Sequence, residues 1–179
     1  MYKDNSLIPS EAVRLAALGL LAMRSRAYAD LARDIRHFTA RIVGPSLDLL
    51  GPSLELLKIE GLIEAVDPKL TNDAQTVRLT KDGETELQRL MNAHLRGPMG
   101  EVNKLIVALK LHFLGLLTPE QRRQQLEMLM EVCDRELIRL TDLRANHTDG
   151  DSALIPWLDH EIGEVKDRRD WFLKLWETV

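Results

Sequence analysis

The sequence predicts a mainly α-helical protein: an N-terminal winged helix-turn-helix with a two-stranded wing, followed by long antiparallel C-terminal helices that form a dimer. Two observations carry this prediction. Residues 54–87 read as an apolar helix, a short hairpin and a second helix, which is the order of a winged helix. Residues 119–176 hold two long apolar stripes at near-heptad spacing. The expected domains are therefore 1–97 and 98–179.

The composition is typical of a small protein from a reducing compartment. The chain has 179 residues, of which 45% are hydrophobic and 29% charged, enough for a packed core and a solvated surface. Its single cysteine, Cys133, excludes an internal disulfide. The opening residues lack the apolar run of a signal peptide, and the longest apolar stretch, 105–117, is interrupted by Lys110 and His112. We expect a cytoplasmic protein with no membrane partner.

Two helices are predicted before the winged segment. Pro9 and Ser10 precede apolar residues at helical spacing over 13–21, so Ser10 is the expected cap of the first helix. After a short break at 24–26, apolar residues recur at helical spacing from Tyr28 to Ile35 and predict the second helix.

Two nearly identical heptads, GPSLDLL at 44–50 and GPSLELL at 51–57, follow one another directly. A period of seven keeps their leucines on one helical face, so the pattern predicts a single amphipathic helix, whose N-terminal half is expected over 42–48. Pro52 lies inside this helix, where a proline removes a backbone hydrogen bond and kinks the helix. Two heptads are too few to indicate a repeat architecture.

The segment after this helix has the pattern of a hairpin. Gly61 is the residue type that most readily takes the left-handed conformation at a helix end. Residues 62–66 and 76–79 read as strands, and the polar stretch 68–74 reads as the loop between them. Thr80 is placed to cap the next helix. A strand pair this short is not stable alone, so we expect it to pack against the helices.

Charge is distributed unevenly along the chain. The formal net charge is −4, yet residues 1–98 carry equal numbers of basic and acidic residues, so the acidic excess belongs to the second half. Arginines are dense between Arg24 and Arg41, which suits contacts with phosphates. Asp30 and Asp34 lie among them, so a solvated helix face with ion pairs explains the same pattern.

Short motifs in the first 96 residues occur in a characteristic order. They are Leu18–Leu21, Tyr28, Leu50 with Pro52 and Leu54, Glu60–Ile63, and Leu79 with Thr80 and Gly83. In this order they resemble the winged-helix domain of the PadR family of transcriptional regulators. The segments at 112–129 and 164–176 look like the helical dimerisation region of the longer PadR-like proteins. The resemblance implies a homodimeric repressor that binds double-stranded DNA, and it allows a small aromatic effector that relieves repression.

The resemblance also implies where DNA is bound. The arginines of the second helix are expected to contact phosphates, and the wing is expected to contact the backbone or the minor groove. A serine at the start of the recognition helix is also expected to contact DNA. The expected DNA-binding residues are Arg26, Tyr28, Arg33, Arg36, Arg41, Ser46, Lys69 and Arg78. Gly51, Glu55 and Leu56 stand where family members carry a tyrosine and basic residues. The alternative function is therefore a protein-interaction module that keeps the winged helix without binding DNA.

The second half begins with a strong helix start, in which Thr118 is the cap, Pro119 the first turn and Gln121 the capping-box residue. The following helix has apolar residues in alternating steps of four and three, which is a coiled-coil seam. The last helix repeats this spacing approximately. The residues expected at the dimer contact are Leu126, Met130, Cys133, Leu137, Leu140, Phe172 and Trp176.

No pattern of catalytic or metal-binding residues is present. The histidines have no ligand spacing, and His112, in an apolar helix, is expected to be a hydrogen-bonded histidine of the core or of an interface. No phosphate loop, nucleophile elbow or activated cysteine occurs. We expect no enzyme activity, cofactor or metal. Trp157, Trp171 and Trp176 fit either a pocket for a flat effector or packing anchors of the dimer, and we favour packing anchors.

Overall fold

The structure is a computed structural model that describes residues 6–7, 9–44, 50–67, 69, 75–95, 97, 101–147 and 153–179. The chain forms two compact units, Met1–Leu116 and Leu117–Val179. The boundary expected from the sequence lies at residue 97, whereas helix α5 packs against α1 and α2 and so belongs to the first unit.

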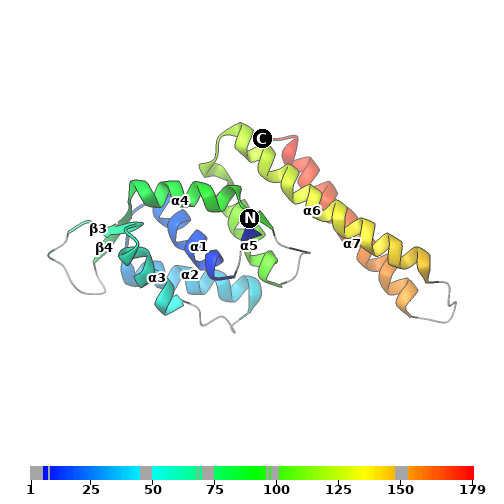
Figure 1. The fold of residues 1–179 in the computed structure, drawn as a ribbon, viewed down its shortest axis with the longest axis horizontal. Helices are drawn as coiled ribbons and strands as arrows, with labels where there is room; N and C mark the ends of the chain where they lie inside the picture. The colour runs from blue at the N-terminus through cyan, green and yellow to red at the C-terminus, as the bar shows by residue number, and fades with distance from the viewer. Residues whose placement is uncertain are drawn as a thin grey trace, which may run out of the picture. The chain divides into compact units, whose positions relative to one another are not determined.

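The first unit has the predicted mainly α-helical winged-helix fold (Figure 1). Its helices and strands follow the chain in this order: β1 (Ser6–Leu7), α1 (Pro9–Met23), β2 (Arg26–Ala27), α2 (Tyr28–Val43), α3 (Leu50–Ile59), β3 (Ile63–Ala65), β4 (Thr76–Leu79), α4 (Lys81–Asn92), β5 (His94–Leu95), α5 (Glu101–His112) and the 3₁₀ turn η1 (Leu114–Leu116).

Helix α1 is the core of this unit. Its residues Leu15, Ala17 and Leu18 are fully buried, and it packs against α2, α3, α4 and α5. The ring of Phe113 lies so close to Gly19 that a Cβ there would be 2.3 Å from it, so no side chain fits at this position. The helix begins at Pro9, which places Ser10 in the first turn and not at the predicted cap position.

Two helices replace the single predicted helix that was expected to include residues 42–48. Residues up to Val43 belong to α2, which ends because Gly44 takes a φ of 87°. Helix α3 starts at Leu50 in the described residues, and Ser46 lies outside them. Pro52 is thus in the first turn, where backbone N–H groups have no helical partner, so it does not have to kink the helix.

The wing is the predicted antiparallel pair β3 and β4, in which Ile63 lies opposite Leu79 and Ala65 opposite Val77. A third strand, β2, pairs antiparallel with the other edge of β4, giving the order β2-β4-β3. In the sequence β2 was expected to be a break between helices, because two residues are too few to show a strand period. The parallel pair of β1 and β5 was missed for the same reason.

Thr80 joins the end of α3, the wing and the start of α4. Gly61 takes the predicted left-handed conformation, with a φ of 71°. The Thr80 hydroxyl donates to the Gly61 carbonyl oxygen at 2.7 Å and accepts from the Gly83 N–H at 3.1 Å, which confirms the predicted cap. A Cβ at Gly83 would lie 2.1 Å from the Leu62 carbonyl oxygen, so only glycine allows this close approach.

The second unit is a helical hairpin of α6 (Pro119–Asn146) and α7 (Leu154–Trp176), which pack side by side (Figure 1). The predicted capping box of Thr118 and Gln121 is present at the start of α6. Polar contacts run along the whole antiparallel pair, which fixes its register. They are Arg123 to the Val179 carbonyl at 2.9 Å, Trp176 to Glu127 at 3.1 Å, Arg169 to Asp134 at 2.5 Å and Arg144 to Asp159 at 2.8 Å. Within the part of the chain that the structure describes, no helix combines the length and the apolarity that a membrane span requires.

Lys110 of α5 is fully buried and holds the end of α4. Its Nζ donates to the carbonyl oxygens of Met91 at 2.5 Å and of Leu90 at 3.3 Å. These carbonyls belong to the last turn of α4, where few backbone partners remain, and that of Leu90 also accepts from the Ala93 N–H at 3.3 Å. Burial disfavours the charged ammonium and lowers the pKa of Lys110 to about 7.

The buried lysine predicts that stability increases with pH. The unfolded chain keeps the ordinary lysine pKa of about 10.4. At pH values between about 7 and about 10.4, the unfolded state therefore binds more protons than the folded state. The free energy of unfolding rises as the pH increases through this range, and the added stability is lost as the pH falls through about 7. Urea unfolding at neutral and mildly alkaline pH, with Lys110→Met as the control that cannot titrate, measures the effect. The difference should grow in favour of the wild type, by up to about 1.4 kcal/mol per pH unit. Equal changes of the free energy of unfolding with pH in the wild type and in Lys110→Met would contradict this prediction.

Candidate nucleic-acid interface

The described part of α3 carries a polar cluster that links it to the start of α2. The Tyr28 hydroxyl donates to Glu55 Oε1 at 2.6 Å. Lys58 Nζ lies 3.8 Å from Glu55 Oε1 and 4.1 Å above the centre of the Tyr28 ring. The hydrogen bond from Tyr28 and the ion pair with Lys58 both act on the carboxylate of Glu55, so part of its negative charge is compensated within the protein.

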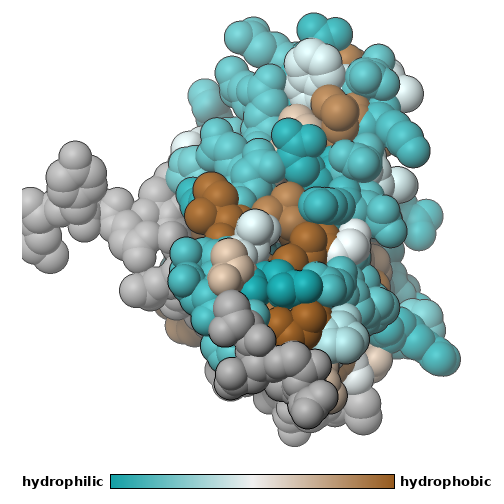
Figure 2. All heavy atoms as spheres, turned by 90° about the vertical axis from the view of Figure 1, so that its right-hand side faces the viewer, coloured by the Kyte–Doolittle hydropathy of each residue, from teal (hydrophilic) through white to brown (hydrophobic). Residues whose placement is uncertain are grey.

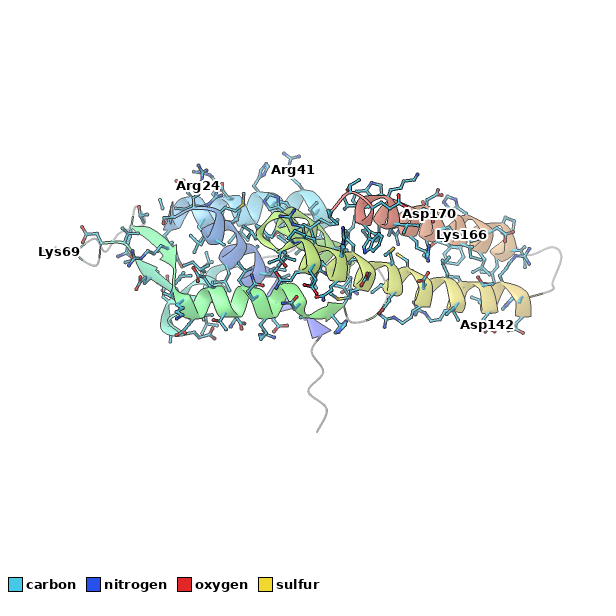
Figure 3. The ribbon with its side chains drawn as sticks, turned by 90° about the horizontal axis from the view of Figure 1, so that it is seen from above. Arg24, Arg41, Lys69, Asp142, Lys166 and Asp170 are labelled. Atoms are coloured by element: carbon cyan, nitrogen blue, oxygen red, sulfur yellow. The ribbon has the colours of Figure 1, made fainter. Side chains whose placement is uncertain are left out.

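Helix α2 presents arginines to solvent. Arg36 and Arg41 are exposed and make no ion pair with any described residue, whereas Arg33 contacts Asp30 at 2.6 Å. Figure 3 shows that Arg24 and Arg41 project outward along one edge of the first unit. Exposed guanidinium groups that have no carboxylate partner are available to phosphates.

The wing presents two basic side chains, Lys69 and Arg78. Lys69 is exposed and lies at the far end of the wing (Figure 3). Arg78 of β4 contacts Glu64 of β3 across the hairpin at 2.7 Å, and both side chains are exposed. Exposed pairs of this kind are weak, so Arg78 can exchange its partner at little cost.

Arg26 does not share the exposure of the other arginines. Its side chain is only 12% exposed, and it lies 2.6 Å from Asp34 Oδ2. Its Nε donates to the Leu20 carbonyl oxygen at 3.4 Å. Arg26 therefore connects β2 with α1 and α2 inside the unit, and its side chain is not presented for the predicted contact with phosphate.

A cavity of about 220 Å³ lies beside Arg26, between α1, α2 and α5. Aromatic rings form part of its wall: the ring centres of Phe38 and His112 are 5.5 Å apart, and those of His112 and Phe113 are 4.8 Å apart. His112 is exposed in the single chain, so it is not a core histidine, and its place at an interface stays a prediction. The rest of the lining is largely apolar, and Arg26 and Asp34 supply the charged groups. Neither this cavity nor the strand that carries Arg26 has a recognisable sequence pattern.

In the second unit, the residues proposed for dimer contact fall into two groups. Leu126, Cys133 and Phe172 are buried in the single chain. The others are partly exposed, namely Met130, Leu137, Leu140 and Trp176. Large apolar residues with greater exposure are Ile138, Leu143, Trp157, Trp171 and Leu173. Apolar side chains are visible among hydrophilic ones where the structure is viewed from the side of the α6–α7 loop (Figure 2).

No metal or catalytic centre is evident among the described residues. No group of three or more histidine, cysteine or acidic side chains in these ranges is arranged to hold a metal ion. Burial raises the pKa of the Cys133 thiol, which disfavours the reactive thiolate.

Solved structures similar to this chain come from Bacillus subtilis and Streptococcus mutans. PadR of Bacillus subtilis in complex with p-coumaric acid is 18% identical, with a TM-score of 0.38, covering 97% of this chain and 98% of that one. The same protein with operator DNA is 19% identical, with a TM-score of 0.36 and coverage of 92% and 97%. The protein smu.1604c of Streptococcus mutans UA159 is 16% identical, with a TM-score of 0.39 and coverage of 90% and 96%.

A search of curated proteins found no match. A family model, that of the AphA-like transcriptional regulators, matches residues 2–176 and thus nearly the whole chain. The recognition of a PadR-like regulator from the sequence is confirmed at this level. The chain belongs to the family of AphA-like transcriptional regulators.

Proposed function

We propose that the protein is a cytoplasmic, homodimeric repressor that binds double-stranded DNA with α3 in the major groove. The observation that carries this proposal is the set of exposed cations on the elements next to α3. Arg36 and Arg41 lie on α2, and Lys69 and Arg78 on the wing. Helix α3 packs against α2 and continues into β3, so these charges flank the helix that reads bases in a winged helix.

The contacts of Glu55, the acidic residue on the described part of α3, weaken the case for a protein-interaction module. A free carboxylate near phosphates weakens DNA binding. Glu55 accepts from Tyr28 and lies near Lys58, so its charge is partly compensated within the protein. DNA binding therefore remains the better proposal.

Dimerisation is supported by the surface of the hairpin. Ile138 is 69% exposed, and Trp157 and Trp171 are about half exposed. A second chain covering these residues would remove apolar surface from water and place two winged helices on one DNA site. In this arrangement Leu126, Cys133 and Phe172 act indirectly, by holding the hairpin that forms the contact.

The cavity beside Arg26 supports the proposed small aromatic effector. A cavity of about 150 Å³ is enough for benzene, so the 220 Å³ here admits a compound with one ring. PadR of Bacillus subtilis has been crystallised with p-coumaric acid, a compound of this class. Phe38 and Phe113 can pack against the ring, and Arg26 is close enough to pair with an acidic group. An effector bound in this cavity relieves repression if the effector-bound protein binds DNA more weakly than the free protein does.

The first prediction tests DNA binding. Arg36→Gln should weaken binding to all duplexes to a similar degree and lower the dependence of log affinity on log salt by about one, because one phosphate contact is lost. Titration of labelled duplexes at several salt concentrations measures both quantities, and two chains should bind per duplex at saturation. Arg135→Gln, which removes an exposed arginine from α6, is the matched control and should bind like the wild type. Wild-type protein that binds no duplex would refute the proposed function, and a changed sequence preference would refute the phosphate role of Arg36.

The second prediction tests the effector cavity. Ala16 is buried at the cavity wall, so Ala16→Leu fills the space that a ring would occupy. Calorimetric titration with p-coumaric acid should show binding to the wild type and to Ala29→Leu, the same change at an exposed position of α2, but not to Ala16→Leu. Absence of binding to the wild type would remove p-coumaric acid as a ligand, and unchanged binding to Ala16→Leu would place the ligand elsewhere.

A further inference from the structure

Helix α3 exposes two large apolar side chains three residues apart, on one face. Leu56 is 47% exposed and Ile59 is 79% exposed. The opposite side of the same helix is fully used in the core, since Leu54 and Leu57 are almost completely buried. Leu56 and Ile59 are therefore surplus to the packing of the first unit, and their exposure has a cost in water.

The polar side chains on this part of α3 already have partners within the protein. Glu55 accepts a hydrogen bond from Tyr28, and Lys58 lies between Glu55 and the Tyr28 ring. Glu60, directly after the helix, contacts Arg14 at 2.8 Å. Direct readout by paired hydrogen bonds needs arginine, lysine, asparagine or glutamine, and residues 54–60 provide only Lys58 for this purpose.

The major groove offers one apolar group to such a surface. Three of the four bases present only donors and acceptors at their edges, whereas thymine adds a C5 methyl group, which apolar side chains contact. We propose that Leu56 and Ile59 read thymine methyl groups, so that this regulator prefers operators with thymines beneath the second half of α3. The inference rests on the proposed DNA-binding function and specifies what its recognition helix selects.

Duplex DNA is the occupant that the surroundings favour for this apolar face. Helix α3 packs against α2, which carries the exposed Arg36, and leads into the wing, which carries Lys69, and these cations suit phosphates on either side of a groove. An apolar surface meant only for a protein partner would have no need of these flanking charges. Burial of one methyl group changes affinity by about fourfold.

The experiment compares one duplex with and without thymine methyl groups. A tight-binding duplex is first selected from a random pool with the full-length wild-type protein, and it is then synthesised again with deoxyuridine in place of thymine, which removes the methyl groups and keeps base pairing. The wild type should bind the thymine duplex at least about fourfold more tightly than the uracil duplex. The double variant Leu56→Ala, Ile59→Ala should bind both duplexes equally. Met23→Ala, which truncates an exposed apolar residue at the end of α1, is the control and should keep the wild-type ratio.

The outcomes separate this inference from the proposed function. Wild-type protein for which no duplex can be selected refutes DNA binding itself, and this inference with it. Wild-type protein that binds both duplexes equally refutes only the reading of thymine. A double variant that keeps the wild-type ratio overturns the assignment to Leu56 and Ile59. If the affinities of this double variant for both duplexes also equal those of the wild type, the apolar pair would be assigned to a protein partner. Circular dichroism of the double variant should match the wild type, since both changed side chains are exposed.

Discussion

The position of the recognition helix relative to the wing depends on the hydroxyl group of Thr80. It donates to the last carbonyl of the turn after α3 and caps the first turn of α4. The Thr80 backbone N–H also donates to the Leu62 carbonyl oxygen at 3.1 Å, which starts the β3–β4 pairing. Gly83 completes the joint, because any side chain there would collide with the backbone at Leu62. Helix, wing and following helix thus meet at one point, and α3 and the wing, which we propose to face DNA, are held at a fixed mutual orientation.

The contacts of Thr80 and Gly83 also explain, in physical terms, a motif that was recognised in the sequence only by its resemblance to a family pattern. Leu79, Thr80 and Gly83 were read as part of a family pattern, with Thr80 as a helix cap. The cap, the positive φ of Gly61 and the strands at 63–65 and 76–79 were predictable because each follows from local chemistry of the chain. What local chemistry does not reveal is the close approach of Gly83 to Leu62, since it depends on the packing of α4 against the wing.

The functional surface was less predictable than the fold, and the arginines explain why. A density of arginines predicts positive charge but not the direction of each side chain. Arg36 and Arg41 face solvent, whereas Arg26 turns inward to Asp34 of α2 and to the Leu20 carbonyl oxygen of α1. In the proposed function Arg26 links the cavity to the wing, since its backbone pairs with β4 and its side chain lines the cavity. A ligand that draws Arg26 away from Asp34 would therefore act directly on the strand next to the wing.

The most direct test of this account is whether the Thr80 hydroxyl holds the DNA-binding surface together. Thr80→Val keeps the shape of the side chain and removes the hydroxyl, while Thr80→Ser keeps the hydroxyl and loses a methyl group. Loss of the buried hydrogen bonds should cost about 1–3 kcal/mol in local stability. The measurement is amide hydrogen exchange in β3, β4 and the first turn of α4, together with affinity for duplex DNA. The account predicts faster exchange there and weaker DNA binding for the valine variant, with near wild-type behaviour for the serine variant. Wild-type exchange and affinity in the valine variant would contradict it.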